Sequence, residues 1–330
     1  MNARSLYEQR LTTPQRAVAP IRSGQRVFVG SNCAEPTLLV EALVGRADRL
    51  ADTEIVQILT LGVAPYAEPR FQDHFRTNAF FIGPNIRDAV NECRADYTPI
   101  FLSELPALFR RGQVPIDYAL IQVAPPDHSG FCSLGVSVDI VKAAAESAHH
   151  VIAEVNTRMP RTLGESFIHV SRIEAFVESD RPILEPPVGA VDDVAERIGH
   201  YIADLIEDGS TLQLGIGSIP DAVLSCLTDK KDLGIHSEMI SDGTVALAKA
   251  GVITNRRKSI HPGKMIVSFC MGSRELYDYV DDNPGIEFWP TEYVNDPFVI
   301  AQNDRMVSIN AAIEVDLTGQ VCADSIGEYF

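Results

Sequence analysis

Short apolar runs alternate along this chain with segments of helical periodicity. Residues 151–156 and 264–269 form apolar runs that have the length of buried strands. Residues 139–148 and 244–250 carry apolar positions at the spacing of one helix face. Strands that alternate with helices are typical of open, mainly parallel sheets. The pattern therefore predicts an α/β fold.

One combination of a turn glycine, an apolar run and a closing glycine occurs twice. The sequence IRSGQRVFVG at residues 21–30 aligns with IEDGSTLQLG at residues 206–215, at an offset of 185. A second match, DHSG at residues 127–130 and DLTG at residues 316–319, follows an apolar run in each copy at an offset of 189. Two matches in the same order predict two tandem α/β domains.

The repeat also suggests where the domains begin and end. A proline follows both copies of the first matched segment: Pro36 in the first copy and Pro220 in the second. We expect each proline at the first position of a helix, where the N–H that proline lacks is not needed. We assign residues 1–185 to the first domain and residues 186–330 to the second, with the proline-rich stretch 181–187 as linker. Only 125 residues follow residue 205, so we expect the second domain to be incomplete.

Composition and charge exclude several classes of protein. The chain has 330 residues, 45% of them hydrophobic, which is enough for a full core. A net charge of −17 argues against partners that carry negative charge, namely nucleic acid and anionic membrane. Residues 1–20 lack the apolar core of a signal peptide, and no apolar stretch has the ~18 residues of a membrane helix. We therefore expect a soluble, cytoplasmic protein.

Neither cysteine nor histidine spacing indicates a metal site. The six cysteines include no C-x-x-C pair, so we expect buried thiols and no disulfide framework. His149 and His150 are adjacent, and on a helix adjacent side chains point about 100° apart, which does not suit chelation.

The first candidate for chemistry is the glycine pair that ends the second copy of the repeat. Residues 211–217 are expected to form a strand that ends in G-x-G, and a helix should begin near Asp221. Backbone N–H groups at such a helix start can hold a phosphate or another polar group. A dinucleotide fingerprint requires a third glycine where Pro220 lies, although Glu238 falls where a ribose-binding acid would be. A nicotinamide dehydrogenase is therefore a distant alternative.

Glu238 is the strongest candidate for a catalytic group. It lies in GIHSEMISDG at residues 234–243, which we interpret as a strand, a Ser-Asp-Gly turn and the start of a helix. An acid at the carboxyl end of a parallel strand faces the crevice in which open α/β sheets bind ligands. The alternatives are that Glu238 is a surface acid or that it pairs with Lys264.

Five ordered motifs resemble the acetyl-CoA hydrolase/transferase family, most closely its CoA-transferases for 4-hydroxybutyrate, butyrate and acetate. They are GIGSIPDAV (215–223), GIHSEMISDG (234–243), HPGK (261–264), YVNDP (293–297) and SINAAIEVD (308–316). The resemblance covers nearly the whole chain. The fold of this family is two tandem α/β CoA-transferase domains, which agrees with the repeat.

The resemblance implies a function for several of these residues. Glu238 would act as a nucleophile that moves CoA between an acyl-CoA and a short-chain carboxylate, by ping-pong steps through an acyl-glutamyl anhydride and a glutamyl-CoA thioester. The CoA-binding residues would be Gly215, Ile216, Gly217, Ser218, Ile219 and Ile313. CoA would be a substrate, with no permanently bound cofactor, and the protein would be a homodimer or a higher homo-oligomer. For Gln213 three positions stay open: it reaches the same crevice, it is packed, or it lies on the far face of the strand.

Two further segments contain residue types that are common in functional sites. Arg256, Arg257 and Lys258, with His261 and Lys264, form a basic cluster that we interpret as a solvated turn, with CoA phosphates or an anionic acid as alternative ligands. Residues 127–129, Asp-His-Ser, are consecutive and cannot form a catalytic triad. We expect them in a loop near the carboxylate pocket between the domains.

The carboxyl end departs from the family pattern. Relatives continue after residue 327 into a glycine-rich loop that supplies CoA contacts, whereas this sequence ends at residue 330. The chain is thus expected to be shortened, which puts its activity in question. Two alternatives stay open: an acyl-CoA hydrolase on the same fold and a truncated, non-catalytic binding subunit.

Overall fold

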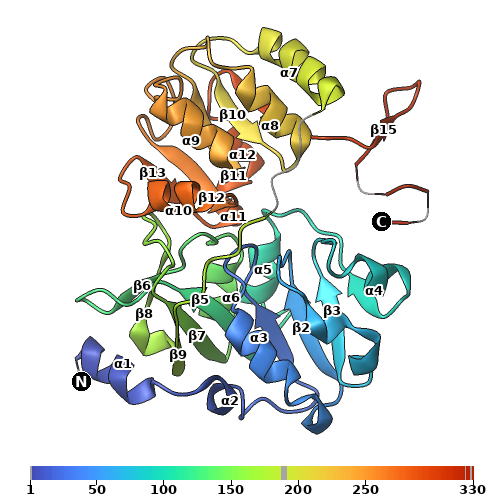
Figure 1. Ribbon diagram of the computed structural model, residues 1–330, viewed down its shortest axis with the longest axis vertical. Coiled ribbons are helices and arrows are strands. Elements are labelled where there is room, and N and C mark those ends of the chain that lie inside the picture. The colour runs from blue at the N-terminus through green and yellow to red at the C-terminus, as the bar shows by residue number, and fades with distance from the viewer. Residues whose placement is uncertain (1, 187–191, 324, 328) are drawn as a thin grey trace.

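Two parallel sheets form the centre of the molecule (Figure 1). The computed structural model describes residues 2–186, 192–323, 325–327 and 329–330. The first sheet contains, in spatial order, β4 (Ala95–Tyr97), β3 (Phe75–Ala79), β2 (Thr53–Gln57), β1 (Arg26–Val29), β5 (Tyr118–Val123), β7 (His150–Asn156) and β9 (Ala175–Ser179). The second contains β13 (Ile286–Phe288), β12 (Met265–Cys270), β11 (Gly234–Ile240), β10 (Thr211–Leu214) and β14 (Met306–Ile309). The predicted α/β fold with mainly parallel sheets is confirmed.

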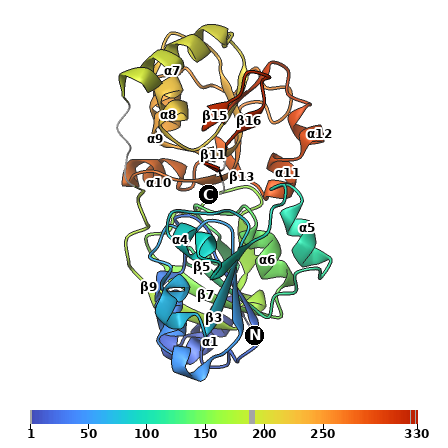
Figure 2. The same ribbon diagram turned by 90° about the vertical axis from the view of Figure 1, so that its right-hand side faces the viewer.

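Helices and two small antiparallel pairs complete the fold (Figure 2). The helices are α1 (Ala3–Arg10), α2 (Pro14–Ala17), α3 (Thr37–Val44), α4 (Arg87–Asn91), α5 (Leu105–Arg110), α6 (Val141–Ser147), α7 (Asp193–Leu205), α8 (Ser218–Ser225), α9 (Asp242–Lys249), α10 (Arg274–Val280), α11 (Thr291–Val294) and α12 (Pro297–Ile300). Single 3-10 turns lie at Ala47–Arg49, Pro65–Ala67, Pro69–Phe71 and Val170–Arg172. The antiparallel pairs are β6 (Phe131–Ser133) with β8 (Phe167–His169) and β15 (Glu314–Val315) with β16 (Val321–Cys322). None of the described helices has both the length and the apolar character needed to span a membrane.

The central strands are apolar because both of their faces are covered. On β1, Val27 and Val29 pack in one core with residues of α3, whereas Phe28 packs in the other core with residues of α5 and α6. All six residues of β5 are buried. Parallel strands covered on both faces have nearly continuous hydrophobic sequences, which explains why these runs were recognisable.

The internal repeat is present in the structure. β1 and β10 lie at the same offset of 185 as the matched sequences, and each follows a turn glycine with positive φ, 76° at Gly24 and 80° at Gly209. β1 lies between β2 and β5, and β10 lies in the same way between β11 and β14. The predicted tandem organisation of the two sheets is therefore confirmed at the level of strand pairing.

The second match is also a structural equivalence. The carboxylate of Asp127 accepts hydrogen bonds from the backbone N–H groups two and four residues later, and the carboxylate of Asp316 does the same. Gly130 and Gly319 have φ of 89° and 88° at the same place in these turns. Carboxylates that bind nearby backbone N–H groups commonly fix such turns, so these motifs specify local structure.

Several predicted details are wrong at the starts of helices. Pro36 precedes α3, and Pro220 is the third residue of α8, which begins at Ser218 and not near Asp221. Pro220 is tolerated because the first N–H groups of a helix have no partner within the helix. Asp242 is the first residue of α9 and does not form a separate turn with its neighbours. The predicted linker, 181–187, has no helix or strand in its described part, and residue 187 lies outside the described residues.

The expectation that the thiols are buried is correct for only half of the cysteines. Cys33, Cys132 and Cys270 are buried, whereas Cys93 is exposed and Cys226 and Cys322 are partly exposed. A small apolar side chain can lie at the surface without a large cost, so residue type alone did not determine these positions.

Backbone hydrogen bonds join the two sheets. The N–H groups of Val138 and Asp139 donate to the carbonyl of Ser268, and Cys270 donates to Val136. At a second place the loop around Gly164 pairs with Phe288 at the end of β13. One continuous hydrophobic core includes residues of both sheets. Loops of the first half are therefore joined to the second sheet by main-chain bonds, and the two halves also share side-chain contacts in one core.

We expect Gly164→Ala to weaken this joint. A Cβ at Gly164 would lie 2.7 Å from the Phe288 oxygen and 2.9 Å from its nitrogen, and the φ of +94° is strained for alanine. Strain of this kind costs about 1–3 kcal/mol, so with the backbone clash we expect the free energy of unfolding in urea to fall by at least ~3 kcal/mol.

Gly24→Ala is the matched control. Its φ is +76° and nothing lies within 4 Å of the added Cβ, so that variant should lose only about 1 kcal/mol from strain. Equal losses in the two variants would show that the contact with Phe288 does not constrain the joint.

Candidate active site

Glu238 lies in a small cavity between the two sheets. It is the fifth residue of β11, the central strand of the second sheet, and its side chain is only partly exposed. The cavity has a volume of about 60 Å³ and is lined by residues from both halves of the chain: Asn32, Ile58, Leu59, Phe81, Leu102, Asp139, Ile216, Glu238 and Phe269. Six of these side chains are apolar, so the carboxylate faces a largely apolar space.

Asn295 is the hydrogen-bond partner of this carboxylate. Its Nδ2 donates to Oε2 of Glu238 at 3.0 Å. Lys264 pairs instead with Glu287 at 3.4 Å, so the alternative that Lys264 neutralises Glu238 is wrong. Sequence reasoning had noted YVNDP at residues 293–297 as part of the resemblance but had given Asn295 no role. The YVNDP motif was the sequence signal from which a role for Asn295 could have been inferred.

Burial changes the acidity of Glu238. Removal from water disfavours the charged form and raises the pKa of Glu238, and the hydrogen bond from Asn295 opposes this by stabilising the carboxylate. A carboxylate that is poorly hydrated and not neutralised by an adjacent cation is a stronger nucleophile than one at the surface. Its environment therefore suits a reactive group.

The glycine pair lies beside this cavity. Ile216 lines the cavity, and Gly215 donates its N–H to the carbonyl of Ile309 on β14. Gly217 has φ of 126°, a region that favours glycine, and α8 starts directly after it with Ser218 and Ile219. The structure thus brings the start of α8 and Glu238 to the same side of the second sheet.

Two other candidates lie outside the Glu238 cavity. Ile313 lines a separate pocket of about 330 Å³, and Phe81 lies between the two spaces because it lines both. The side chain of Gln213 bonds to Ser308 and Asn310, so it follows the edge of β14 and does not pack into the core.

A buried carboxyl group that sequence reasoning missed forms part of the cavity wall. Asp139 accepts hydrogen bonds from the side chains of Ser31, Asn32 and Ser137 and from two backbone N–H groups. Burial raises the pKa of Asp139, and these donors oppose that effect. Asn32 is held by this network at φ of 55°. The sequence pattern indicates Asp139 only as the start of a helix, because the donors Ser31 and Asn32 are distant in sequence and give no local signal.

The basic cluster is a solvated turn, as expected, at Arg256 and Arg257, which are exposed, but not at Lys258 and His261. Lys258 is buried, and its Nζ donates to the carbonyls of Ile235 and Lys264 at 2.7 Å each. Burial lowers the pKa of Lys258 to about 7. His261 also points inward, with Nε2 2.6 Å from the hydroxyl of Tyr293. The prediction was wrong for Lys258 because backbone carbonyls, which every residue carries, can accept a buried ammonium.

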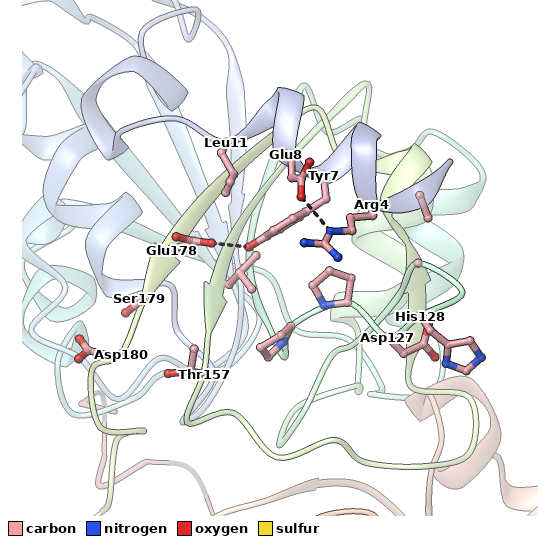
Figure 3. Close-up of a pocket in the computed structure, with 15 residues that line it drawn as sticks. Arg4, Tyr7, Glu8, Leu11, Asp127, His128, Thr157, Glu178, Ser179 and Asp180 are labelled. Carbon is pink, nitrogen blue, oxygen red and sulfur yellow. Dashed lines mark hydrogen bonds and ion pairs between the residues drawn. The ribbon is translucent and has the colours of Figure 1, made fainter. Parts of the chain in front are cut away.

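The Asp-His-Ser segment belongs to a different pocket, of about 1030 Å³, beneath α1 (Figure 3). Asp127 and His128 lie at one side of that pocket, and Tyr7 of α1 donates to Glu178 on β9 at 3.0 Å. The pocket shares no lining residue with the Glu238 cavity. The segment is a loop as predicted, and it does not line the Glu238 cavity.

Comparison with known proteins agrees with this arrangement. The family model described as acetyl-CoA hydrolase/transferase N-terminal domain matches residues 1–187, and the corresponding C-terminal domain model matches residues 272–330. The chain is 54% identical to a 4-hydroxybutyrate coenzyme A transferase of Clostridium kluyveri, over 99% of this chain and 76% of that protein. It is 38% identical to a butyryl-CoA:acetate CoA-transferase of Anaerostipes caccae, over 99% and 75%.

Solved structures show the same relationship. RipA from Yersinia pestis superposes with a TM-score of 0.94 at 37% identity, covering 98% of this chain and 78% of that one. A 4-hydroxybutyrate CoA-transferase from Porphyromonas gingivalis gives 0.86 at 42% identity, covering 96% and 77%. The fold and these relatives define an enzyme of the CoA-transferase class. The chain belongs to the acetyl-CoA hydrolase/transferase family, and the dehydrogenase alternative is wrong.

We expect Asn295→Leu to raise the pKa of Glu238. The variant removes the donor that stabilises the carboxylate, while burial continues to favour the neutral form. In a 13C NMR titration of glutamate-labelled protein, Glu238 of the wild type should titrate above exposed glutamates, and the variant should titrate at still higher pH. Asn283→Leu is the control, because Asn283 bonds to Tyr279 and not to Glu238; a pKa that does not rise in Asn295→Leu would contradict the contact.

We expect Lys258→Met to destabilise the fold. Methionine retains most of the apolar stem but leaves the Ile235 and Lys264 carbonyls without their donor. Loss of a partner for buried polar groups costs roughly 1–3 kcal/mol per group, so with two carbonyls the free energy of unfolding should fall by about 2–6 kcal/mol. Lys264→Met should lose under about 1 kcal/mol because its ion pair is partly exposed. If Lys258→Met lost no more stability than Lys264→Met, water would have replaced the ammonium as the donor to the two carbonyls.

Proposed function

We propose that this chain transfers CoA between an acyl-CoA of the acetyl, butyryl or 4-hydroxybutyryl type and a short-chain carboxylate, with Glu238 as nucleophile. The observation that carries the proposal is the position of Glu238: a carboxylate in an apolar cavity between two sheets, bonded to an amide and not to a cation. The activities named for the relatives of 54% and 38% identity support the choice of substrates.

The proposed reaction has two half-reactions. An oxygen of the Glu238 carboxylate attacks the thioester carbonyl, which forms a mixed anhydride and expels CoA thiolate. The thiolate then attacks the glutamyl carbonyl of the anhydride, which releases the first acid as its carboxylate and leaves a glutamyl-CoA thioester. A second carboxylate repeats these steps in reverse order. The first acid leaves as its carboxylate, but the glutamyl group is then activated as the CoA thioester, so the energy of the original thioester is conserved on the enzyme.

The cavity accounts for two requirements of this chemistry. A volume of about 60 Å³ admits only a few non-hydrogen atoms, since one water needs roughly 10–15 Å³ by the same measure, and a short acyl chain fits this limit. The anhydride must also be protected from water. The apolar side chains of Ile58, Leu59, Phe81, Leu102, Ile216 and Phe269 disfavour water beside Glu238.

CoA is assigned to the second half of the chain. We propose that Gly215, Ile216, Gly217, Ser218 and Ile219 contact CoA at the start of α8, with Ile313 near its outer part. Unpaired N–H groups at a helix start can donate to a phosphate or to the oxyanions of the two tetrahedral intermediates. In this assignment residues 1–185 supply the carboxylate side and residues 186–330 the nucleophile. The homo-oligomeric state and the cytoplasmic location stay predictions.

We expect a covalent Glu238-CoA adduct in protein incubated with butyryl-CoA alone. Borohydride should reduce its thioester to an alcohol, which peptide mass spectrometry would locate at Glu238, and acetate added before the reductant should remove the adduct. Glu238→Gln should form no adduct. Glu238→Asp should be slowed by about 10²-fold, because its carboxylate is set back by one methylene.

Glu275→Gln is the control, since that acid is exposed and pairs with Lys249. An active preparation with an unmodified Glu238 would refute the nucleophile. Free CoA that accumulates at the full rate without a carboxylate acceptor would favour the acyl-CoA hydrolase instead.

A further inference from the structure

Glu238 is oriented by Asn295, and Asn295 follows directly after the one-turn helix α11. This helix packs against β11 and β12, so it covers the face of the sheet from which Glu238 projects. Other contacts hold its first and middle residues: Thr291 donates its N–H to the carbonyl of Asp139, and the hydroxyl of Tyr293 meets His261. The contact that fixes the end of α11, next to Asn295, is therefore decisive for the orientation of the Glu238 carboxylate.

His236 is the side chain that holds this end. It lies on β11 two residues before Glu238, on the same face of the strand, and is only 1% exposed. Its Nε2 is 3.0 Å from the carbonyl oxygen of Val294, the residue that precedes Asn295. A carbonyl only accepts, so Nε2 carries the hydrogen and the ring donates.

The ring is suited to a fixed, neutral donor. Burial lowers the pKa of His236 to about 4, and the nearby charges of Lys258 and His261 act in the same direction. Its Nδ1 has no hydrogen-bond partner in the part of the chain that the structure describes. One N–H is thus available, and it is committed to Val294.

We propose that His236 is a positioning residue for the nucleophile: by bonding to the Val294 carbonyl it fixes the backbone of Asn295, whose amide in turn holds the Glu238 carboxylate. This inference rests on the proposed function, in which Glu238 attacks the acyl-CoA. A displacement of about 1 Å in a reacting group can cost 10²-fold in rate. Loss of the His236 donor leaves the Val294 carbonyl without this partner, so that the backbone next to Asn295 is held only by the helical bonds of its own N–H groups.

Two matched amide substitutions test the position of the donor. Glutamine can place its amide nitrogen near the position of Nε2, whereas asparagine is one methylene shorter and does not reach the Val294 carbonyl. Adduct formation at Glu238 is followed by rapid quench with butyryl-CoA and borohydride. We expect His236→Gln to retain the wild-type rate within about threefold and His236→Asn to be slowed by about 10- to 100-fold.

A double substitution tests whether His236 acts through Asn295. If it does, His236→Asn combined with Asn295→Ala should be no slower than Asn295→Ala alone. A purely structural role would instead give multiplied losses, and that result would overturn the inference. Equal slowing in His236→Gln and His236→Asn would overturn it as well.

The wild type separates this inference from the proposed function. If the wild type forms no Glu238 adduct, the proposed function fails and the positioning role fails with it. If the adduct forms in the wild type and at the same rate in His236→Asn, only the positioning role is refuted. Urea unfolding of each variant shows whether a slowed variant is folded. Should His236→Asn fail to fold, a slowed His236→Gln would by itself contradict the proposal, because that variant retains the donor.

Discussion

The geometry of the candidate active site depends on the main-chain hydrogen bonds that join residues 136–139 to the end of β12. These bonds place the buried Asp139 and its donors opposite β11, where Glu238 projects. Backbone bonds of this kind are insensitive to side-chain identity, and buried ones have to be satisfied within the protein. Since each sheet supplies part of the cavity wall, the site exists only when both sheets fold and join.

Asp139, Lys258 and Glu238 differ in how their ionisable groups are satisfied, and their roles follow from that difference. Asp139 has a donor for each oxygen, and Lys258 has two carbonyl acceptors, so both are held in one place and stabilise the fold. Glu238 has one amide donor and open space beside it. A carboxylate that is partly desolvated and incompletely satisfied is the group available for chemistry.

The sequence predicted what is encoded locally. Buried strands were recognisable because both faces of a parallel sheet are covered, and the Asp127 and Asp316 turns because their bonds span four residues. Glu238 stood out by its place at the end of a strand. The roles of Asn295, Asp139 and Lys258 could not be assigned, because their partners are either side chains distant in sequence or backbone groups that every sequence contains. The start of α8 was misplaced because Pro220 is compatible with any of the first helical positions, so the proline does not identify the first one.

The repeat brings two equivalent loops with different backbone surroundings to the cavity, through Asn32 and Ile216. At the offset of 185, Asn32 after β1 corresponds to Gly217 after β10, and both have positive φ, 55° and 126°. Asparagine adopts such a conformation at a cost, which its bonds to Ser137 and Asp139 offset, so the loop after β1 is filled by its own polar network. Glycine adopts it freely, and nothing lies within 4 Å of a Cβ built at Gly217. Equivalent loops from the two halves thus line the Glu238 cavity, the first held by hydrogen bonds of Asn32, and the second with open space beside Gly217 in which a ligand can approach the backbone.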